Sequence, residues 1–278
     1  MSSVVAGNEA TGKSPGVNTS ISFFGVLRAI GSWLLQRKWS LISIFGGLLL
    51  WELTSRYLVS SALFLAAPTQ IVAAVFKLWG GRLPYDIGLS ALEFFVGYGL
   101  ASLCGIAIGL AMASSAAAKQ ALDPWIVGLY ATPTVALAPL FILWLGVGIW
   151  SKVAVVFILV IFPVILNTEA GLRATSKQLV ETVRSFGASP SQIFWKVSLP
   201  SALPFIFAGL KIAIGRGLIG VVVAELFGSR AGLGQLISQS ADAFNMPELF
   251  AGVVVLAVAG IAMTNAFGAL ERRLVHWN

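Results

Sequence analysis

The chain has 278 residues, of which 58% are hydrophobic and only 10% are charged, against about 25% charged in typical soluble domains. Its mean hydropathy is +0.90. Too few charged side chains remain to cover a water-exposed surface, so the composition predicts a polytopic membrane protein. One cysteine, Cys104, excludes a disulfide framework and a multi-cysteine zinc site, and one histidine, His276, excludes a histidine-cluster metal site.

The first 38 residues differ in composition from the rest of the chain. Residues 1–20 are rich in serine, glycine, asparagine and threonine, which predicts a disordered tail. Residues 21–36 are apolar but short, so we expect an interfacial helix that ends at Arg37 and Lys38. No signal peptide is predicted, because no small-residue cleavage site follows a basic start. We therefore predict a cytoplasmic tail and interfacial helix over 1–38 and a transmembrane domain over 39–278.

The remaining sequence contains six apolar segments of the length a membrane span requires. A helix needs about 20 apolar residues to cross the hydrocarbon core. The segments lie at about 40–58, 88–113, 124–147, 152–171, 203–228 and 249–270. No segment between two spans is long enough for a soluble domain. The predicted fold class is an all-α membrane protein with about six transmembrane helices.

The formal net charge of +7 divides unevenly across these spans. With both termini inside, 11 lysines and arginines lie on the cytoplasmic side: Lys13, Arg28, Arg37, Lys38, Lys119, Arg173, Lys177, Arg184, Lys196, Arg272 and Arg273. Five lie on the opposite side: Arg56, Lys77, Arg82, Lys152 and Arg230. This ratio follows the positive-inside rule. The positive charge therefore indicates orientation, and we predict no nucleic-acid partner.

The second span carries a small residue at every fourth position. The ladder consists of Gly97, Ala101, Gly105, Gly109 and Ala113. Such spacing lets another helix approach closely, so we predict a packing role. Cys104 lies beside the ladder and is expected to be a small buried side chain.

The third span contains three prolines, Pro124, Pro133 and Pro139, with hydroxyls at Thr132 and Thr134 beside the second. Proline lacks a backbone donor and kinks or breaks a helix. Two interpretations stay open: a static kink that packs well, or a broken helix in which Thr132, Pro133 and Thr134 line a pathway.

The fifth span carries charges inside the membrane. Lys211 is near enough to the cytoplasmic end to extend toward the headgroups, whereas Arg216 lies near the midplane, where an ionised group is costly and often functional. Glu225 is nine residues further, about 13 Å along a helix, so the two cannot pair within one span. Two interpretations stay open for Arg216 and Glu225. Either each is buried in a pairing that holds the helices in register, or they line a pathway in which Arg216 contacts an anion. Glu93 of the second span is a candidate counter-charge.

The cytoplasmic loop at about 173–203 has the pattern of a capped helix–turn–helix. Apolar residues at 179, 180, 183 and 186 share one helical face. Gly187 stands where a left-handed C-cap is expected. Ser189, Pro190 and Gln192 combine an N-cap, proline at the first position and glutamine at the third, and the second helix is expected to stop at Leu199-Pro200. An amphipathic connector resting on the headgroups fits the same periodicity. A DNA-reading unit fits poorly, because so short a segment is held between two spans.

The same loop resembles a known motif. Glu181 precedes Gly187 by six positions, and nine more residues separate Gly187 from Val197–Pro200. The spacing is that of the EAA motif of ABC-importer permeases: E-A-A, three residues, G, nine residues, I-x-L-P. Thr182 and Val183 replace the two alanines, and valine replaces the isoleucine.

Further segments resemble the nitrate/sulfonate/taurine group of these permeases, and the similarity covers roughly residues 60–275. They are residues 141–148, 162–168 and 215–225. The resemblance implies a type I ABC-importer permease fold, a homodimeric core and alternating access for a small solute. An anion such as a sulfonate, nitrate or a taurine-like solute is favoured, and bicarbonate, an aromatic acid or a vitamin precursor stays open. Residues 228–234 resemble the family's glycine-rich outer turn, where a periplasmic or extracellular substrate-binding protein would make contact; a plain tight turn is the alternative.

The resemblance also implies that the loop holds the coupling helices, which dock on two cytoplasmic ABC ATPase subunits. The residues carried over to this role are Glu181, Arg184, Phe186, Gly187, Ser189, Ile193, Phe194, Leu199 and Pro200. Among them, Phe186, Ile193 and Phe194 are expected to expose apolar side chains that anchor in a groove of the partner. Glu181 and Arg184, three apart, are placed to pair with each other or with the partner. No G-x-x-x-x-G-K-[ST] segment occurs, so ATP and Mg²⁺ are expected on the partner ATPase, with no cofactor, metal or catalytic residue in this chain. The expected location is the bacterial inner membrane, with both termini cytoplasmic.

Two other classes compete with this interpretation. A self-powered secondary transporter usually has inverted halves, and none is visible. A membrane enzyme needs titratable residues clustered at one depth, whereas Glu93, Arg216 and Glu225 are dispersed along the sequence.

Overall fold

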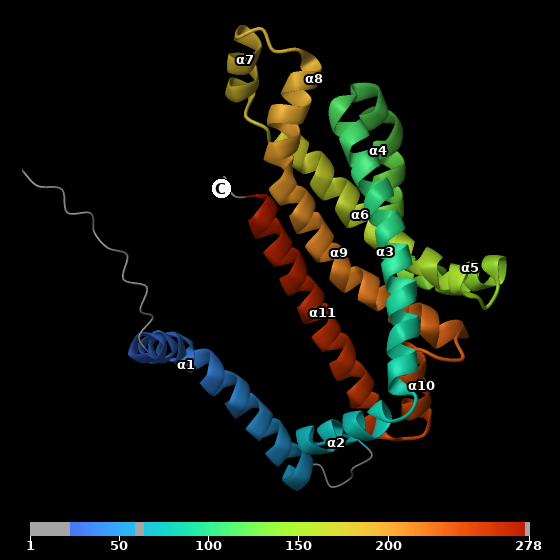
Figure 1. Ribbon diagram of the computed structural model, residues 1–278. Helices are drawn as coiled ribbons and strands as arrows, with labels where there is room; N and C mark the ends of the chain where they lie inside the picture. Colours follow the sequence, from blue (N-terminus) through green and yellow to red (C-terminus); the bar gives the residue numbers. More distant parts are fainter. Residues whose placement is uncertain (1–22, 59–63, 276–278) are drawn as a thin grey trace, which may run out of the picture. The chain divides into compact units, whose positions relative to one another are not determined.

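Figure 1 shows a computed structural model, which describes residues 23–58 and 64–275, with side chains from residue 38 onward. The predicted tail, residues 1–20, lies outside the described residues. Every regular element in the described ranges is a helix. The all-α prediction is confirmed for this part of the chain.

The chain divides into two compact units, residues 1–51 and 52–278. The described part of the first unit is most of helix α1, Phe23–Leu53. The helix is continuous through Arg37 and Lys38, so the predicted end there is wrong. No proline or glycine occurs between residues 33 and 45, and lysine and arginine are good helix formers, so nothing local stops the helix. Assignment of residues 1–38 to the cytoplasmic side stays a prediction.

The second unit contains the remaining elements. Its helices are the π-turn η1 (Thr54–Leu58), α2 (Pro68–Trp79), α3 (Leu83–Ser114), α4 (Ala116–Ala131), the 3-10 turn η2 (Thr134–Leu137), α5 (Ala138–Leu145), α6 (Ile149–Arg173), α7 (Lys177–Ser185), α8 (Pro190–Ile193), the π-turn η3 (Phe194–Ser198), α9 (Leu199–Gly228), α10 (Leu233–Asp242) and α11 (Met246–Leu274).

Four helical stretches of the described chain are long and apolar enough to cross a membrane: α3, α6, Pro190–Gly228 and α11. The pair formed by α4 and Thr134–Leu145 qualifies as a fifth if it is one bent span. The first predicted span, 40–58, covers the end of α1 and η1 and is not among these, so the count of six stays a prediction.

The core forms where α6 packs between α3 and α9. A Cβ on Gly97, Gly105 or Gly109 would lie 2.7–2.9 Å from the side chains of Val156, Val164 or Thr168 on α6, closer than real Cβ atoms approach. The predicted packing role of the small-residue ladder is therefore confirmed.

Cys104 is exposed, so the prediction that it is buried is wrong. It precedes Gly105 by one residue and is therefore rotated by about 100° from the face that α6 covers.

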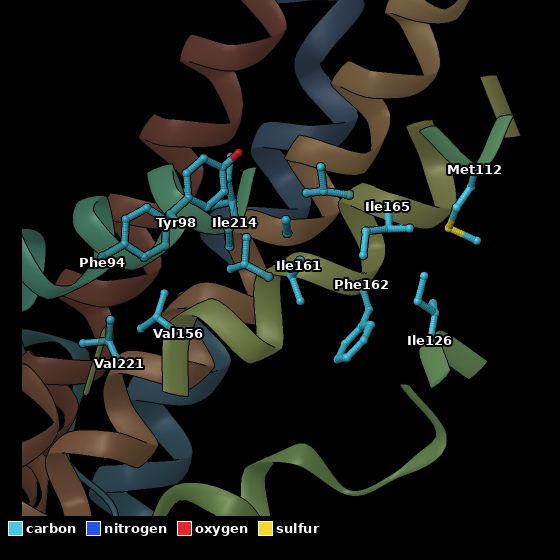
Figure 2. Packing of buried hydrophobic residues seen from close by; sticks show 14 residues of the cluster. Phe94, Tyr98, Met112, Ile126, Val156, Ile161, Phe162, Ile165, Ile214 and Val221 are labelled. Atoms are coloured by element: carbon cyan, nitrogen blue, oxygen red, sulfur yellow. The ribbon is translucent and has the colours of Figure 1, made fainter. Parts of the chain in front are cut away.

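Aromatic side chains fill the space beside the ladder, where α3, α6 and α9 meet. Figure 2 shows Phe94 and Tyr98 next to each other, with Ile161, Ile165 and Ile214 nearby. The two rings stack with centroids 5.2 Å apart, and the Tyr98 hydroxyl donates to the Leu210 carbonyl oxygen at 2.9 Å. The hydroxyl thus ties α3 to α9 without leaving a buried donor unpaired.

The third predicted span is broken. Helix α4 ends at Ala131, Thr132 has extended backbone (ψ 140°), and the following helical segment is bent by 87°. Thr132 precedes Pro133, and a residue before proline is driven out of the α region. The helix is broken and not merely kinked, whereas a pathway lined by Thr132, Pro133 and Thr134 stays a prediction.

The two ends of the second unit carry different elements. The helices α7 and α8 lie at one end, whereas α2 and α10 lie at the other (Figure 1). The loop at 173–203 and the turn at 228–234 are therefore at opposite ends, as the span assignment requires. Which end faces the cytoplasm stays a prediction.

Candidate functional site

The loop at 173–203 folds as the predicted capped helix–turn–helix. Gly187 has φ +85°, its N–H donates to the Arg184 carbonyl at 2.9 Å, and the Ala188 N–H donates to the Val183 carbonyl at 3.3 Å. These two bonds form a Schellman C-cap on α7, which needs the left-handed conformation that glycine adopts most easily. No atom lies within 4 Å of a Cβ built on Gly187, so the requirement is for conformation and not for space.

The second half of the loop begins with the predicted capping box. The Gln192 N–H donates to Ser189 Oγ at 3.3 Å, and the Ser189 N–H donates to Gln192 Oε1 at 2.9 Å. Both bonds satisfy amides that have no partner within the helix. The turn between α7 and α8 is therefore fixed at both ends by local hydrogen bonds.

The second helix does not stop at Leu199-Pro200, so that prediction is wrong. Helix α8 continues through η3 into α9, and Pro190–Gly228 forms one stretch of 39 residues. In η3 the Leu199 N–H bonds to the Phe194 carbonyl, one residue further back than in an α-helix. This wider turn accommodates Pro200, which has no N–H, in the first turn of α9.

The exposed apolar surface of the loop differs from the predicted one. Phe186 is 86% exposed and Trp195 is 64% exposed, whereas Ile193 is buried, so its prediction as an exposed anchor is wrong. Trp195 was missed because the π-turn shifts the helical phase at that position. The Phe194 ring is half-buried and packs edge-on against the Trp195 ring, with the two ring centroids 5.2 Å apart. Together Phe186, Phe194 and Trp195 form the loop's aromatic surface.

Two charged residues of the loop are accessible to a partner. Glu181 and Arg184 are both exposed, and the described side chains form no ion pair between them. Leu199 and Pro200 are half-buried at the start of α9. A hollow in the angle of the helix–turn–helix is lined by Val183, Phe186, Gly187, Ala188, Gln192 and Lys196.

At the opposite end, charged and polar side chains from α3, α6 and α9 form a buried polar network of Asp86, Ser90, Glu93, Lys152 and Glu225. All five are buried. Asp86, Ser90 and Glu93 are spaced four and three residues apart and so share one face of α3. Lys152 Nζ lies 3.1 Å from Glu93 Oε1. Lys152, counted above among the five cations on the outer side of the spans, lies in the first turn of α6 and forms an ion pair with Glu93.

The network binds the N-terminus of α10. The N–H of Gly232 donates to Asp86 Oδ1 at 2.8 Å, that of Leu233 to Ser90 Oγ at 2.9 Å, and that of Gly234 to Glu225 Oε2 at 2.5 Å. The Ser90 hydroxyl in turn donates to Glu225 Oε1 at 2.5 Å. Two carboxylates and a hydroxyl therefore satisfy three amides that a helix start leaves unpaired, and negative charge there complements the helix dipole.

This geometry gives Glu93 and Glu225 contacts within the chain itself. Both are fully buried, so each holds neighbouring elements together in this structure. Asp86 and Ser90 were missed at the sequence level, although their spacing from Glu93 along one helical face was a usable signal. Gly232, at φ +116°, completes the turn, and a Cβ there would run into the Glu225 carboxylate.

Arg216 faces the broken span. Its Nη2 donates to Tyr130 Oη at 3.1 Å, and its guanidinium carbon lies 5.2 Å from the centre of the Tyr130 ring. Tyr130 is the penultimate residue of α4, two positions before Thr132. The Thr132 hydroxyl donates to the Gly128 carbonyl at 2.9 Å, and Pro133 is exposed beside it, while Thr134 is half-buried. Tyr130 was missed, because nothing in the sequence indicates which helix Arg216 faces.

Comparisons with known proteins agree on one family. Residues 101–276 match the family model described as binding-protein-dependent transport system inner membrane component. The chain is 33% identical to the formylaminopyrimidine transport permease protein ThiX of Halalkalibacterium halodurans, over 83% of this chain and 92% of that protein. It is 31% identical to the taurine transport system permease protein TauC of Escherichia coli, over 82% and 85% of the two chains. It is 34% identical to the putative aliphatic sulfonates transport permease protein SsuC of Bacillus subtilis, over 82% and 83%.

Solved structures support the fold. A chain of the inward-facing MetNI methionine ABC transporter superposes with a TM-score of 0.61 at 20% identity, covering 69% of this chain and 95% of that chain. A likeness at this identity concerns the fold alone.

Proposed function

Since the chain belongs to the binding-protein-dependent transport system inner membrane component family, we propose that it is the permease subunit of an ATP-driven importer for a small organic anion. Members of this family are multi-pass permeases of the inner membrane and perform transport, not catalysis. In our proposal two copies of the chain form the pathway, two ATPase subunits dock on the loop at 173–203, and a binding protein delivers the solute at the other end. ATP and Mg²⁺ are held by the ATPase subunits.

The observation that carries the coupling role is the continuity of Pro190–Gly228. At 1.5 Å per residue, 39 helical residues extend roughly 58 Å, enough to reach from one side of a bilayer to the other. The stretch begins in the capped helix–turn–helix and carries Glu225 in its last turn, where this residue binds the start of α10. A displacement of the loop is therefore passed along a single helix to the opposite end of the molecule.

The aromatic surface of the loop supports docking on a separate subunit. Phe186 and Trp195 expose large apolar side chains on a segment whose backbone is fixed by two caps. Exposed aromatic side chains on a rigid turn are favourable anchors for a partner's groove, because little entropy is lost when they bind. Glu181 and Arg184 add unpaired charges at the edge of this surface.

Two of the three relatives support a sulfonate as the solute, whereas the name of the third, ThiX, states formylaminopyrimidine. The names of TauC and SsuC state taurine and aliphatic sulfonates. We propose the same chemical class for this chain. An alternative, a carrier driven by an ion gradient, would transport without an ATPase subunit.

The docking proposal is tested by two loop variants, Phe186→Ser and Glu181→Lys, purified with the ATPase subunits of the same transporter. We expect the amount of ATPase that co-purifies to fall about tenfold, the effect of losing one anchor residue worth 1–2 kcal/mol. Phe76→Ser is the matched control, because Phe76 is 75% exposed on α2 at the opposite end, and it should leave docking unchanged. Normal assembly and transport by both loop variants would show that the assignment of the loop is wrong.

A further inference from the structure

Helix α9 carries two cations within its apolar sequence, and they are neutralised differently. Lys211 forms an ion pair with Glu271 of α11. Arg216, five residues further, has no carboxylate within ion-pair distance among the described residues; its partner is the neutral Tyr130 hydroxyl. An ionised group within a span is costly unless it is paired or faces a water-filled cavity. Arg216 therefore needs water, an anion or a group of the second permease copy.

The surroundings of Arg216 favour a water-filled space. Tyr130 lies at the end of α4, where Ala131, Thr132 and Pro133 are all exposed and the backbone is not helical. Non-helical backbone at membrane depth is tolerated only where protein buries it or where it lines an aqueous cavity. This second observation is independent of the first, because it concerns the backbone of another helix.

The geometry leaves part of the guanidinium free. Tyr130 Oη accepts one hydrogen bond, from Arg216 Nη2, and the centre of its ring lies 5.2 Å from the guanidinium carbon. The remaining N–H groups project in the plane of the guanidinium, where they match the paired oxygens of an oxyanion. The hydrogen bond and the cation–π contact with Tyr130 favour one orientation of the guanidinium and so reduce the entropy lost on binding.

We propose that Arg216 and Tyr130 form a binding site for the sulfonate group of the transported solute, with Arg216 contacting its oxygens and Tyr130 acting as a positioning residue. The site rests on the proposed function in so far as the transported solute is the ligand. Arg216 supplies a positive charge inside the span, where a transported anion loses most of its hydration.

The test uses trifluoromethanesulfonate, a compact sulfonate whose binding is followed by ¹⁹F NMR line broadening, with the complete permease–ATPase complex in nanodiscs. We expect saturable broadening with the wild-type complex. Arg216→Met should weaken the affinity at least about tenfold, since hydrogen bonds to charged groups are lost. Arg216→Lys should recover part of it, because the charge is kept and the planar group is not. Tyr130→Phe should weaken affinity about two- to fivefold.

The control is the double variant Lys211→Met/Glu271→Gln, which removes the paired cation of the same helix together with its partner. It should bind trifluoromethanesulfonate as the wild type does. Equal weakening in the control and in Arg216→Met would overturn the proposal, because a general effect of positive charge would then explain both. Absence of saturable binding to the wild type would also overturn it.

Two further measurements separate the site from the proposed function and from an interface role. Uptake of labelled taurine into proteoliposomes containing the wild-type complex and its binding protein tests the solute class by itself. If taurine is not taken up but trifluoromethanesulfonate binds in an Arg216-dependent way, the site stands and that solute class does not. If Arg216→Met instead separates the two permease copies on size-exclusion chromatography, Arg216 is an interface residue and the proposed site is wrong.

Discussion

Replacing Glu225 with alanine should release the N-terminus of α10 from α9. The carboxylate accepts hydrogen bonds from the Gly234 N–H and the Ser90 hydroxyl, each at 2.5 Å, and it is fully buried. A hydrogen bond to a charged group contributes about 1.5–3 kcal/mol, and the Gly234 amide has no other acceptor at the start of its helix. Local opening around Gly234 should become easier by about that amount, which corresponds to a roughly ten- to hundredfold faster amide exchange.

Hydrogen–deuterium exchange on a peptide covering residues 229–236 measures this effect in the purified complex. Glu225→Gln should give a smaller increase, because the amide oxygen keeps one acceptor for Gly234. Glu248→Ala is the control: Glu248 lies at the same end of the molecule and pairs with Lys77, whose side chain is 76% exposed, so its loss should change the exchange by less than about threefold. Exchange in Glu225→Ala within twofold of the wild type would refute the role of the carboxylate.

Two further predictions concern stability, measured by detergent or thermal unfolding of the purified chain. Gly109→Ala should lower the free energy of unfolding by about 1–3 kcal/mol, because the new Cβ would lie 2.7 Å from that of Thr168. The control Gly99→Ala, whose Cβ would have no atom within 4 Å, should lower it by less than about 1 kcal/mol. Equal losses in the two variants would contradict the close contact between α3 and α6. Lys152→Met should lower the free energy of unfolding by about 3–5 kcal/mol, because it leaves the Glu93 charge buried and unpaired. Adding Glu93→Leu should recover most of this loss. A double variant as unstable as the single one would argue against the ion pair.

Much of the local structure was predictable because it depends on residues close together in the chain. Gly187 and the pair Ser189 and Gln192 make their cap bonds within five residues, so their spacing alone specified the turn. The ladder that includes Gly105 and Gly109 was recognisable for the same reason, since one helix repeats its face every three to four residues.

The wrong predictions concern residues whose usual local effect is changed by an unusual helical turn or by the packing of a neighbouring helix. Pro200 normally ends a helix, but the π-turn before it removes the need for its N–H, and the helix continues. Near this turn, Ile193 is buried and Trp195 is exposed. Cys104 was assigned to the packed face from its neighbour Gly105 without allowing for the rotation of one residue.

Composition and hydropathy by themselves determined that this chain is a bundle of membrane helices, and motif spacing determined its capped loop and its family resemblance. Only the tertiary structure decided the partners of the few charged residues in the spans. Glu225 binds Ser90, 135 positions earlier, and Arg216 contacts Tyr130, 86 positions earlier. Such pairs depend on which helix faces lie together, and the packing of α3, α6 and α9 sets those faces. A buried charge must find a partner among the groups that packing brings within reach, and a one-dimensional pattern does not contain that distance.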